Sequence, residues 1–402
     1  MRFFKDFSLS AFAAGFVAVL VGFTSSVAIV FQAAQAFQAG PELISSWMWA
    51  LGLGMGLCSL LPSLYWRKPV MVAWSTPGAA VLASAGLAGH FSMAQATGAF
   101  MVSALLILLL GVSGWFERLM SRIPLALATG LLAGVLARFG LQAFDAARHA
   151  PLLVLSMLLA YLLSRRYLPR FAVVLTLLVA VLVAGLQGSL DFSGVRFELA
   201  RPVFTSPQFD LGALISLALP LFVVTTASQN LPGVAAIRAA GYGGAQGIPV
   251  SKVISLSGLA TLVLAPFGAF ALNLSALTAA ICMGPEAHAD PRRRYTAAVA
   301  CGGLYVLVGL FGAAVTGVLS AFPPALVAAI AGLALLGSIG QGLATALQHE
   351  ADREAALITF LVTLSGVVLW GVGSAFWGVV AGVLALFIQR GRFWLVPGNT
   401  TK

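Results

Sequence analysis

The sequence predicts an all-α polytopic membrane protein with fourteen transmembrane segments in two inverted repeats of seven, and with short extended strands in segments three and ten. Three observations support this fold class. The 402 residues are 60% hydrophobic and only 8% charged, with a mean hydropathy of +1.01, and water-soluble domains do not tolerate so few charges. Basic residues gather in short loops between apolar spans. A proline also interrupts the third span, where a continuous helix cannot pass.

Fourteen apolar stretches divide the chain, and the first of them starts close to the N-terminus. Residues 1–5 could begin a signal peptide, but the apolar run over 8–37 is too long for one and lacks a clear cleavage site, so it is expected to be a transmembrane helix. The expected segments are 11–38, 44–63, 70–88, 93–113, 123–143, 151–164, 171–187, 209–231, 250–267, 268–284, 294–314, 323–347, 355–371 and 373–389.

Basic residues separate between the two sides that these crossings define. With a cytoplasmic N-terminus, 18 of the 22 basic residues lie in inside loops, and the exceptions at or near outside loops are Arg138, Arg148, Arg196 and Arg201. Because positively charged loops stay on the cytoplasmic side, both termini are expected there. The net charge of +10 follows from this pattern, and membrane lipid rather than nucleic acid is the expected partner.

The third segment is expected to be a broken crossing. Pro77 lacks an N–H and suits the first turn of a helix, and Ser75 or Thr76 before it is a good helix cap. The segment therefore predicts an extended run over 70–74 followed by a half-helix over 77–87. Such backbone survives at membrane depth only where protein or a polar cavity surrounds it.

The two halves of the chain, 1–200 and 201–402, match each other. At an offset of 199, Pro124 falls on Pro323 and the stretch 94–113 falls on 293–312; at an offset of 201, Thr24 falls on Thr225. Each identity is weak by itself, but the nearly constant offset indicates a repeat, and seven crossings per half make the repeat inverted.

The repeat predicts a second broken segment over 266–284. The offset of 199 places Trp74 on Asn273 and Thr76 on Ser275. The two segments would enter from opposite sides, each with its extended part first. Their half-helix N-termini are therefore expected to face each other near the middle of the membrane.

Facing helix N-termini favour an anion such as a carboxylate, because unpaired N–H groups and two partial positive charges meet in one volume. Neighbouring hydroxyl and amide groups must help, since each helix end contributes only about 0.3–2 kcal/mol. The alternative is that these hydroxyls donate hydrogen bonds to the backbones of their own helices. This alternative fits the amide side chains less well, because an amide costs more free energy to bury. The candidate substrate-binding residues are Ser25, Trp74, Ser75, Thr76, Pro77, Gly78, Thr225, Ser228, Gln229, Asn230, Asn273, Leu274 and Ser275.

Titratable residues give little support to other kinds of site. All twelve acidic residues lie near segment ends or in loops, and the four histidines are dispersed without metal spacing, so neither a metal nor a cofactor is expected. Glu286 and His288, just after the second half-helix, are candidates for proton coupling; the alternative is a solvated loop end beside three arginines over 292–294. Without a nucleophile–base or metal cluster, an enzyme is not expected.

Five strings resemble the benzoate/proton symporter family, BenE, and the similarity runs through nearly the whole chain. They are residues 46–52, 73–80, 114–120, 228–235 and 278–288. This family is similar in architecture to the uracil transporter UraA. The resemblance implies antiparallel strands in segments three and ten, a core of segments 1–4 and 8–11, and a gate of segments 5–7 and 12–14.

The resemblance implies a secondary active importer of benzoate or a related aromatic carboxylate, coupled to protons, in a bacterial-type inner membrane. Nucleobase transporters of this architecture carry glutamates on segments eight and ten, where this chain has Gln229 and Asn273 or Ser275; the difference disfavours a nucleobase. An inorganic-anion exchanger of the same architecture remains the alternative, a passive channel is a more distant one, and a homodimer is left open.

Overall fold

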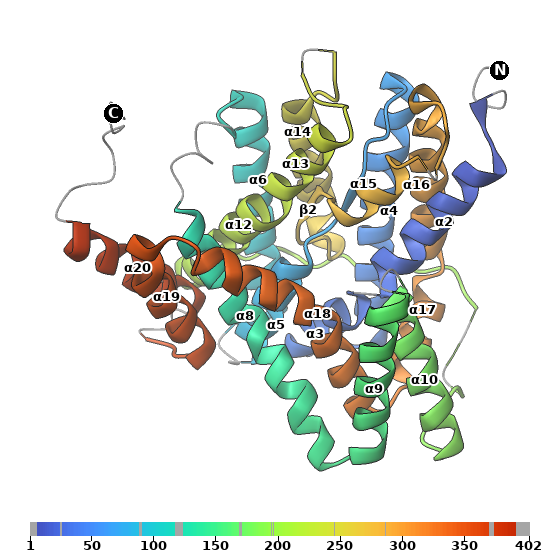
Figure 1. Ribbon diagram of the computed structural model, residues 1–402. Coiled ribbons are helices and arrows are strands. Elements are labelled where there is room, and N and C mark those ends of the chain that lie inside the picture. The colour runs from blue at the N-terminus through green and yellow to red at the C-terminus, as the bar shows by residue number, and fades with distance from the viewer. Residues whose placement is uncertain are drawn as a thin grey trace.

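The protein is mainly helical, with two short strands near the middle of the bundle (Figure 1). The computed structural model describes residues 6–24, 26–87, 91–116, 124–168, 171–193, 195, 197–244, 246–285, 287–369 and 374–390. Within this part, seven helices are long and apolar enough to cross a membrane, or eight if Pro291–Leu310 and Gly312–Ser320, bent by 68°, form one span. The predicted class of helical membrane protein is therefore confirmed.

The first half of the chain follows the expected segments closely, except that the first one is divided. A continuous helix over 11–38 was expected. The structure instead has two helices, of which the first ends at Thr24 and the second begins at Val27. The elements are α2 (Leu9–Thr24), α3 (Val27–Ala36), α4 (Pro41–Trp66), β1 (Val72–Trp74), α5 (Thr76–Leu87), α6 (Met93–Ser113), α8 (Leu125–Asp145), η1 (Ala146–Arg148), α9 (Pro151–Tyr167) and α10 (Ala172–Leu186).

The second half has a longer eighth segment than predicted, because the helix continues to Ala239 through two π-helical turns, a feature often found at functional sites. The elements are α11 (Leu211–Ala213), η3 (Leu214–Ala218), α12 (Leu219–Thr225), η4 (Thr226–Asn230), α13 (Leu231–Ala239), α14 (Val250–Leu264), η5 (Ala265–Phe267), β2 (Leu272–Leu274), α15 (Leu277–Cys282), η6 (Pro291–Arg293), α16 (Tyr295–Leu310), α17 (Gly312–Ser320), α18 (Pro324–Ala346), η7 (Glu350–Asp352), α19 (Arg353–Ser365) and α20 (Ser374–Arg390).

The strands β1 and β2 lie in the two segments where the sequence predicts extended backbone, and they pair antiparallel. Ala73 is opposite Asn273, and Trp74 is opposite Leu272. A two-fold axis through this pair exchanges Trp74 with Leu274, an offset of 200 residues. The predicted equivalence of Trp74 with Asn273 is therefore wrong by one position, because identities in neighbouring helices do not fix the register of a three-residue strand.

Polar side chains satisfy the outer edges of this two-stranded sheet. The hydroxyl of Ser59 accepts from the Val72 N–H (3.0 Å), and that of Thr261 accepts from the Leu272 N–H (3.0 Å). On β2, the Asn230 Oδ1 accepts from the Leu274 N–H at 2.9 Å. An open sheet edge at membrane depth would otherwise leave costly unpaired groups, so these contacts explain how extended backbone persists inside the bundle.

Glycines allow the helices around the strands to approach closely. A Cβ on Gly52 of α4 would lie 2.6 Å from the Gly309 Cα of α16, and one on Gly56 would lie 2.6 Å from the Gly302 carbonyl oxygen. On α8, a Cβ on Gly134 would lie 2.7 Å from a carbonyl oxygen of α19. Small residues thus bring backbones together, as is typical of membrane helices.

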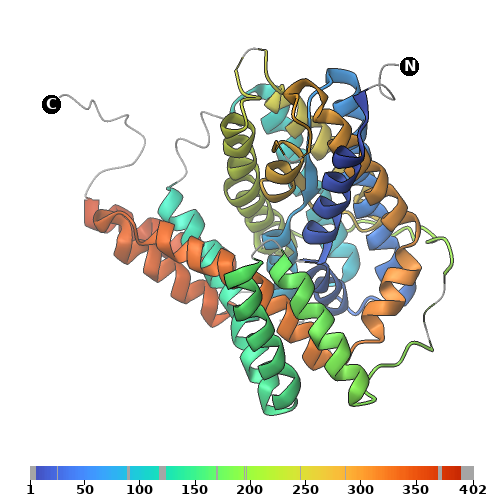
Figure 2. The ribbon, with the colours of Figure 1, turned by 45° about the vertical axis from the view of Figure 1, so that its right-hand side comes forward.

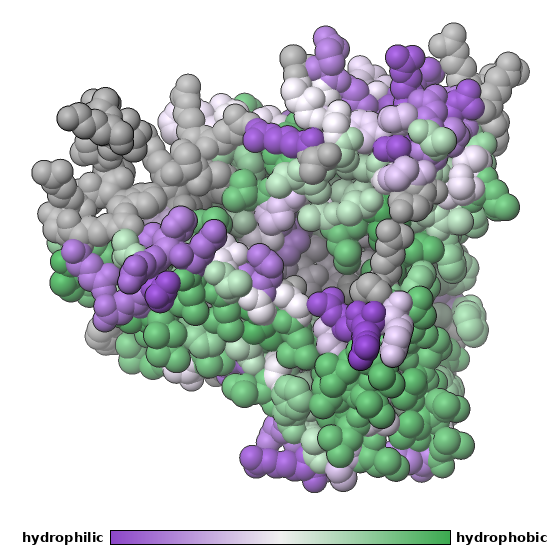
Figure 3. Space-filling model, viewed as in Figure 1, coloured by the Kyte–Doolittle hydropathy of each residue, from purple (hydrophilic) through white to green (hydrophobic). Residues whose placement is uncertain are grey.

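The helices form two groups. Figure 2 shows an upright group around the strands, including α2, α4, α6, α14 and α16, and a tilted group of α8, α18, α19 and α20. Figure 3 shows a broad apolar surface over the lower part of the molecule, where α9 and α10 expose leucines such as Leu155, Leu159 and Leu182. These side chains suit contact with lipid.

Candidate functional site

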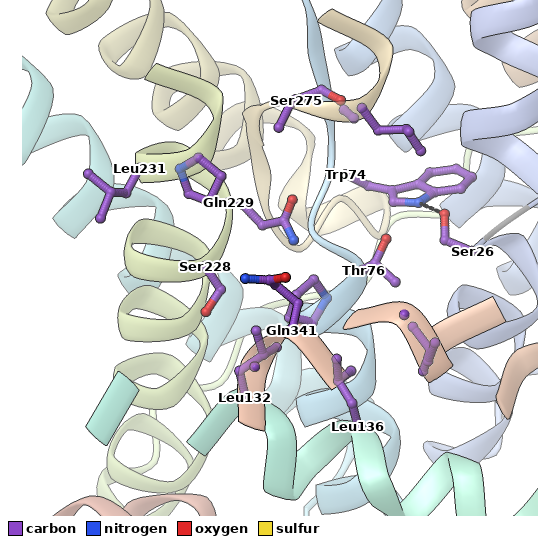
Figure 4. Close-up of a pocket in the computed structure, with 18 of the residues that line it drawn as sticks. Ser26, Trp74, Thr76, Leu132, Leu136, Ser228, Gln229, Leu231, Ser275 and Gln341 are labelled. Atoms are coloured by element: carbon purple, nitrogen blue, oxygen red, sulfur yellow. Dashed lines mark hydrogen bonds between the residues drawn. The ribbon is translucent and has the colours of Figure 1, made fainter. Parts of the chain in front are cut away.

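A cavity of about 670 Å³, named here the central cavity, lies between the strand region and the facing sides of α8 and α18 (Figure 4). Its volume is within the usual range for small-molecule sites. The start of α5, the turn from η4 to α13, the start of α15 and α16 contribute to one side, and α8 and α18 to the other.

The structure brings six of the predicted site residues together around the central cavity: Trp74, Thr76, Pro77, Ser228, Gln229 and Ser275. Other predicted residues are not part of its lining. These are Ser75, Gly78, Thr225, Asn230, Asn273 and Leu274. Ser25 and Glu286 lie outside the described residues.

The start of α5 offers fewer free N–H groups than expected. The Ser75 hydroxyl accepts from the Gly78 N–H (3.0 Å), and the Ser75 carbonyl accepts from the Ala79 N–H (2.8 Å). Pro77 has no N–H to offer. Of the first turn, the Thr76 N–H and the Thr76 hydroxyl have no partner among the described residues, so both are available to a ligand. Thr225, placed at the substrate by sequence, instead donates to the Ser75 hydroxyl (3.1 Å).

The start of α15 presents a hydroxyl pair to the central cavity. The Ser275 hydroxyl accepts from both the N–H (3.3 Å) and the hydroxyl (2.7 Å) of Thr278. Ala276 and Leu277 also line the cavity. Their N–H groups have no partner among the described residues. Because α15 has only six residues, its contribution comes from these local groups rather than from a helix dipole.

Both buried asparagines hold the strands in place. In the amide orientation that satisfies both of its groups, Asn273 accepts from the Ser75 N–H (3.0 Å) and donates to the Leu274 carbonyl (2.8 Å). Asn230 accepts from Leu274 as described above. Both side chains are fully buried, and their hydrogen bonds to backbone give them a structural role.

Trp74 forms an apolar wall of the central cavity. Its indole N–H donates to the Ser26 hydroxyl at 2.7 Å, and its ring lies 5.3 Å from the ring of Phe23. These contacts fix the indole plane. Leu132 and Leu136 of α8 face the cavity from the other side (Figure 4), so an apolar ring has walls on both sides.

Several polar groups around the cavity are without a protein partner in the described part of the chain. The buried Ser228 hydroxyl is one, and the Gln229 carboxamide is another. Gln341 of α18 also points into the cavity (Figure 4) and makes a long bond of 3.3 Å from its Nε2 to the Thr345 hydroxyl. Gln341, Thr345, Thr129 and Tyr305 also line the cavity and were not predicted from the sequence. The signal for Gln341 was an amide in an otherwise apolar span, although Gln341 is an exposed residue in the structure.

The central cavity is uncharged as far as the chain is described, because its lining there has no Asp, Glu, Lys, Arg or His. His288 lies in the loop after α15, where its Nδ1 accepts from the Asp290 N–H (3.0 Å) and its carbonyl accepts from Arg294 (2.8 Å). It does not line the cavity. The described lining can therefore bind an anion only through neutral donors.

The chain is similar to known membrane proteins over nearly its whole length. The family model BenE, benzoate membrane transport protein, matches residues 5–388. The inner membrane protein YdcO of Escherichia coli (strain K12) is 47% identical over 385 residues, which cover 94% of this chain and 97% of that protein. The benzoate membrane transport protein of Acinetobacter baylyi (strain ATCC 33305 / BD413 / ADP1) is 40% identical over 384 residues, 96% of each chain.

Solved structures share the fold at low sequence identity. The transmembrane domain of a cyanobacterium bicarbonate transporter, BicA, superposes with a TM-score of 0.57 at 14% identity, covering 93% of this chain and 97% of that one. The structure of SLC26A9 gives a TM-score of 0.59 at 12% identity, covering 94% of this chain and 65% of that one. These similarities show that the chain shares its fold with both structures.

Proposed function

Because the chain belongs to the BenE family of benzoate membrane transport proteins, we propose that it imports benzoate or a related aromatic carboxylate together with a proton. Membership of this family supports transport across a membrane rather than enzymatic activity, and the fold shared with a bicarbonate transporter supports an anionic substrate.

The central cavity is the observation that carries this proposal. It combines apolar walls from Trp74, Leu132 and Leu136 with neutral donors from Thr76 and Gln229. Small-molecule sites have this composition, mostly apolar with a few placed polar groups. The ring of benzoate fits between the apolar walls, and its carboxylate lies at the start of α5, where the helix N-terminus favours a negative charge.

The proton is proposed to travel on the substrate carboxyl group. A carboxylate with a pKa near 4 is anionic at neutral pH, and bringing it inward against the membrane potential costs about 2.3 kcal/mol per 100 mV. One proton cancels this charge. Since the described cavity lining has no acidic or basic residue, the substrate itself is the most direct carrier of the proton. Glu286 and His288, beyond α15, are the alternative carriers.

The proposed architecture has fourteen crossings in two inverted repeats, 1–200 and 201–402, with both termini cytoplasmic. The helix contacts support it: α4 packs on α16 and α14 on α6, and an offset of about 200 exchanges these two pairs. Cysteines introduced at Ser92 and Gln187 should react with an impermeant reagent from outside, and those at Arg67 and Arg293 should not. Outside labelling at Arg67 would contradict the crossing count.

In this topology the central cavity faces the cytoplasm. It reaches Leu125 and Thr345, close to the cytoplasmic ends proposed for α8 and α18. In the C-terminal half of α5, the Ser84 hydroxyl accepts from Arg138 of α8 at 2.6 Å. This contact joins the two groups of helices. Alternating access would break this contact while closing the cytoplasmic opening.

Labelled benzoate uptake into proteoliposomes tests the function. Accumulation driven by an inward proton gradient at zero potential, and competed by unlabelled benzoate, is the expected result. An inorganic-anion exchanger, the alternative suggested by the shared fold, would take up bicarbonate or chloride without a proton gradient and would ignore aromatic acids. Absence of benzoate uptake and binding would refute the proposal.

A further inference from the structure

We propose that Gln341 of α18 binds the substrate carboxylate directly, so that the site is complete only when α18 faces the start of α5. This inference rests on the proposed function, since it assigns a ligand to the same site. Gln341 lies on the opposite side of the cavity from the two broken segments, which are the elements that the sequence associates with the substrate.

The need for a further donor follows from the groups already engaged. The Ser75 hydroxyl bonds the Gly78 N–H, and the Asn273 amide bonds strand backbone. A carboxylate has about four acceptor positions, and leaving a desolvated charge without partners is expensive. The start of α5 itself supplies only the N–H and the hydroxyl of Thr76, so the remaining acceptor positions of a carboxylate bound there are left to donors elsewhere in the lining, such as Gln229 and Gln341.

Gln341 has the chemistry and position to supply one. Its carboxamide points into the cavity, as does that of Gln229 from η4 on the other side (Figure 4). One N–H of Gln341 makes the long bond to Thr345 (3.3 Å), and its second N–H has no protein partner in the described residues. Since no charged residue is present in the described lining, the donors available to an anion there are neutral, and the two carboxamides offer such donors from opposite sides of the cavity.

Close helix packing fixes the position of Gln341. A Cβ on Gly332 of α18 would lie 2.4 Å from the Phe139 carbonyl oxygen of α8, and one on Gly342, next to Gln341, would lie 3.3 Å from the Ala133 Cβ. The two helices therefore pack as one unit, and the distance from Gln341 to the start of α5 depends on how the two groups of helices are arranged.

The test compares two ligands that differ in charge, benzoate and benzamide, on purified full-length protein at neutral pH. Gln341→Leu should weaken benzoate binding by about ten- to a hundredfold, because a hydrogen bond to a charged group is lost. Gln341→Glu should weaken it by more than about a hundredfold through repulsion. Benzamide binding to Gln341→Glu should be retained or tightened, because the new carboxylate can accept from the amide N–H groups.

Gln348→Leu, which changes an exposed glutamine of the same region outside the cavity lining, is the matched control and should bind both ligands as the parent does. The inference would be overturned if Gln341→Glu kept the parent's preference between benzoate and benzamide. It would also be overturned if Gln341→Leu bound benzoate with the parent's affinity. If Gln341→Glu does not fold, the leucine variant alone decides. Failure of the parent protein to bind benzoate would instead refute the proposed function.

Discussion

The two broken segments share a backbone plan but present different chemistry to the central cavity. Each has a three-residue strand followed by a serine at the same position of the repeat, Ser75 and Ser275, whose hydroxyl accepts from an N–H three residues on. After β1, a helix of 12 residues begins at Thr76; after β2, α15 has only 6. The repeat thus provides a symmetric scaffold, and the sequence differences make the site asymmetric.

The asymmetry assigns different tasks to the two segments. The first contributes the indole wall of Trp74 and the longer helix, whose N-terminus is suited to an anion. The second contributes small hydroxyl groups, and its Asn273 stabilises the strand pair where the first segment has Ala73. We therefore expect substitutions in the first segment to affect binding most, and Asn273 substitutions to affect stability.

The largest expected difference is between Thr76→Asp and Ala276→Asp, which introduce a carboxylate at equivalent positions of the two segments. At Thr76 it would lie beside the substrate carboxylate, and like charges about 4 Å apart repel by about 4 kcal/mol at an effective dielectric of 20. Benzoate affinity should fall by roughly a thousandfold, against about tenfold for Ala276→Asp, where the distance is larger. Thr76→Asn, without charge, controls for shape; equal losses from both aspartates would contradict the asymmetry.

A smaller effect is expected from Asn273→Ala, which makes the centre of β2 like that of β1. Two buried hydrogen bonds are lost. The Ser75 N–H keeps its bond to the Ala271 carbonyl (2.9 Å), so the main cost is the Leu274 carbonyl left without the amide, and the free energy of unfolding should fall by about 1–3 kcal/mol. Thermal unfolding in detergent measures it. Ser45→Ala is a suitable control, since it removes a buried hydroxyl that has no partner within the described residues. A stable variant with lost benzoate binding would place Asn273 at the substrate after all.

Alanine substitutions of Ser75 and Ser275 should also differ, the first in stability and the second in benzoate affinity, but by smaller amounts. Ser75→Ala removes the cap of the longer helix and should cost about 1 kcal/mol of stability, with little effect on ligand affinity in the folded protein. Ser275→Ala, at the cavity, should reduce benzoate affinity a few-fold. Unfolding and binding titrations on both variants provide the comparison, and interchanged phenotypes would reverse the assignment of tasks.

The smallest effect is expected for Glu286→Gln, just beyond the second segment. If the proton travels on the substrate, this variant should accumulate benzoate under a proton gradient as the parent does. Retained exchange with lost gradient-driven accumulation would show instead that the proton passes through Glu286.

Much of the fold could be predicted because its signals are local. Pro77 with Ser75 before it marks the break in the third segment, where the structure has the strand β1 followed by the helix α5. The repeat located the second strand to within one residue. Its register was missed because the offset varies between 199 and 201 along the chain, and the structure requires 200 at the strands.

The site was harder to predict because its parts come from distant segments. Sequence identified amides that are costly to bury, but it could not distinguish Gln229, which faces the cavity, from Asn230 and Asn273, which bond the strands. Gln341 was overlooked because nothing along α18 indicates which of its faces meets the broken segments. Such contacts depend on how the two groups of helices pack.

The central claim is that the ring of an aromatic carboxylate binds in the central cavity with its carboxylate at the start of α5. A crystal structure with 4-bromobenzoate, located by the anomalous signal of bromine, tests it most directly. We predict the bromine between Trp74 and the α8 leucines Leu132 and Leu136, with the carboxylate within hydrogen-bond distance of the Thr76 N–H. A bromine site outside this cavity, or an inverted ligand with its carboxylate against α8, would contradict the account.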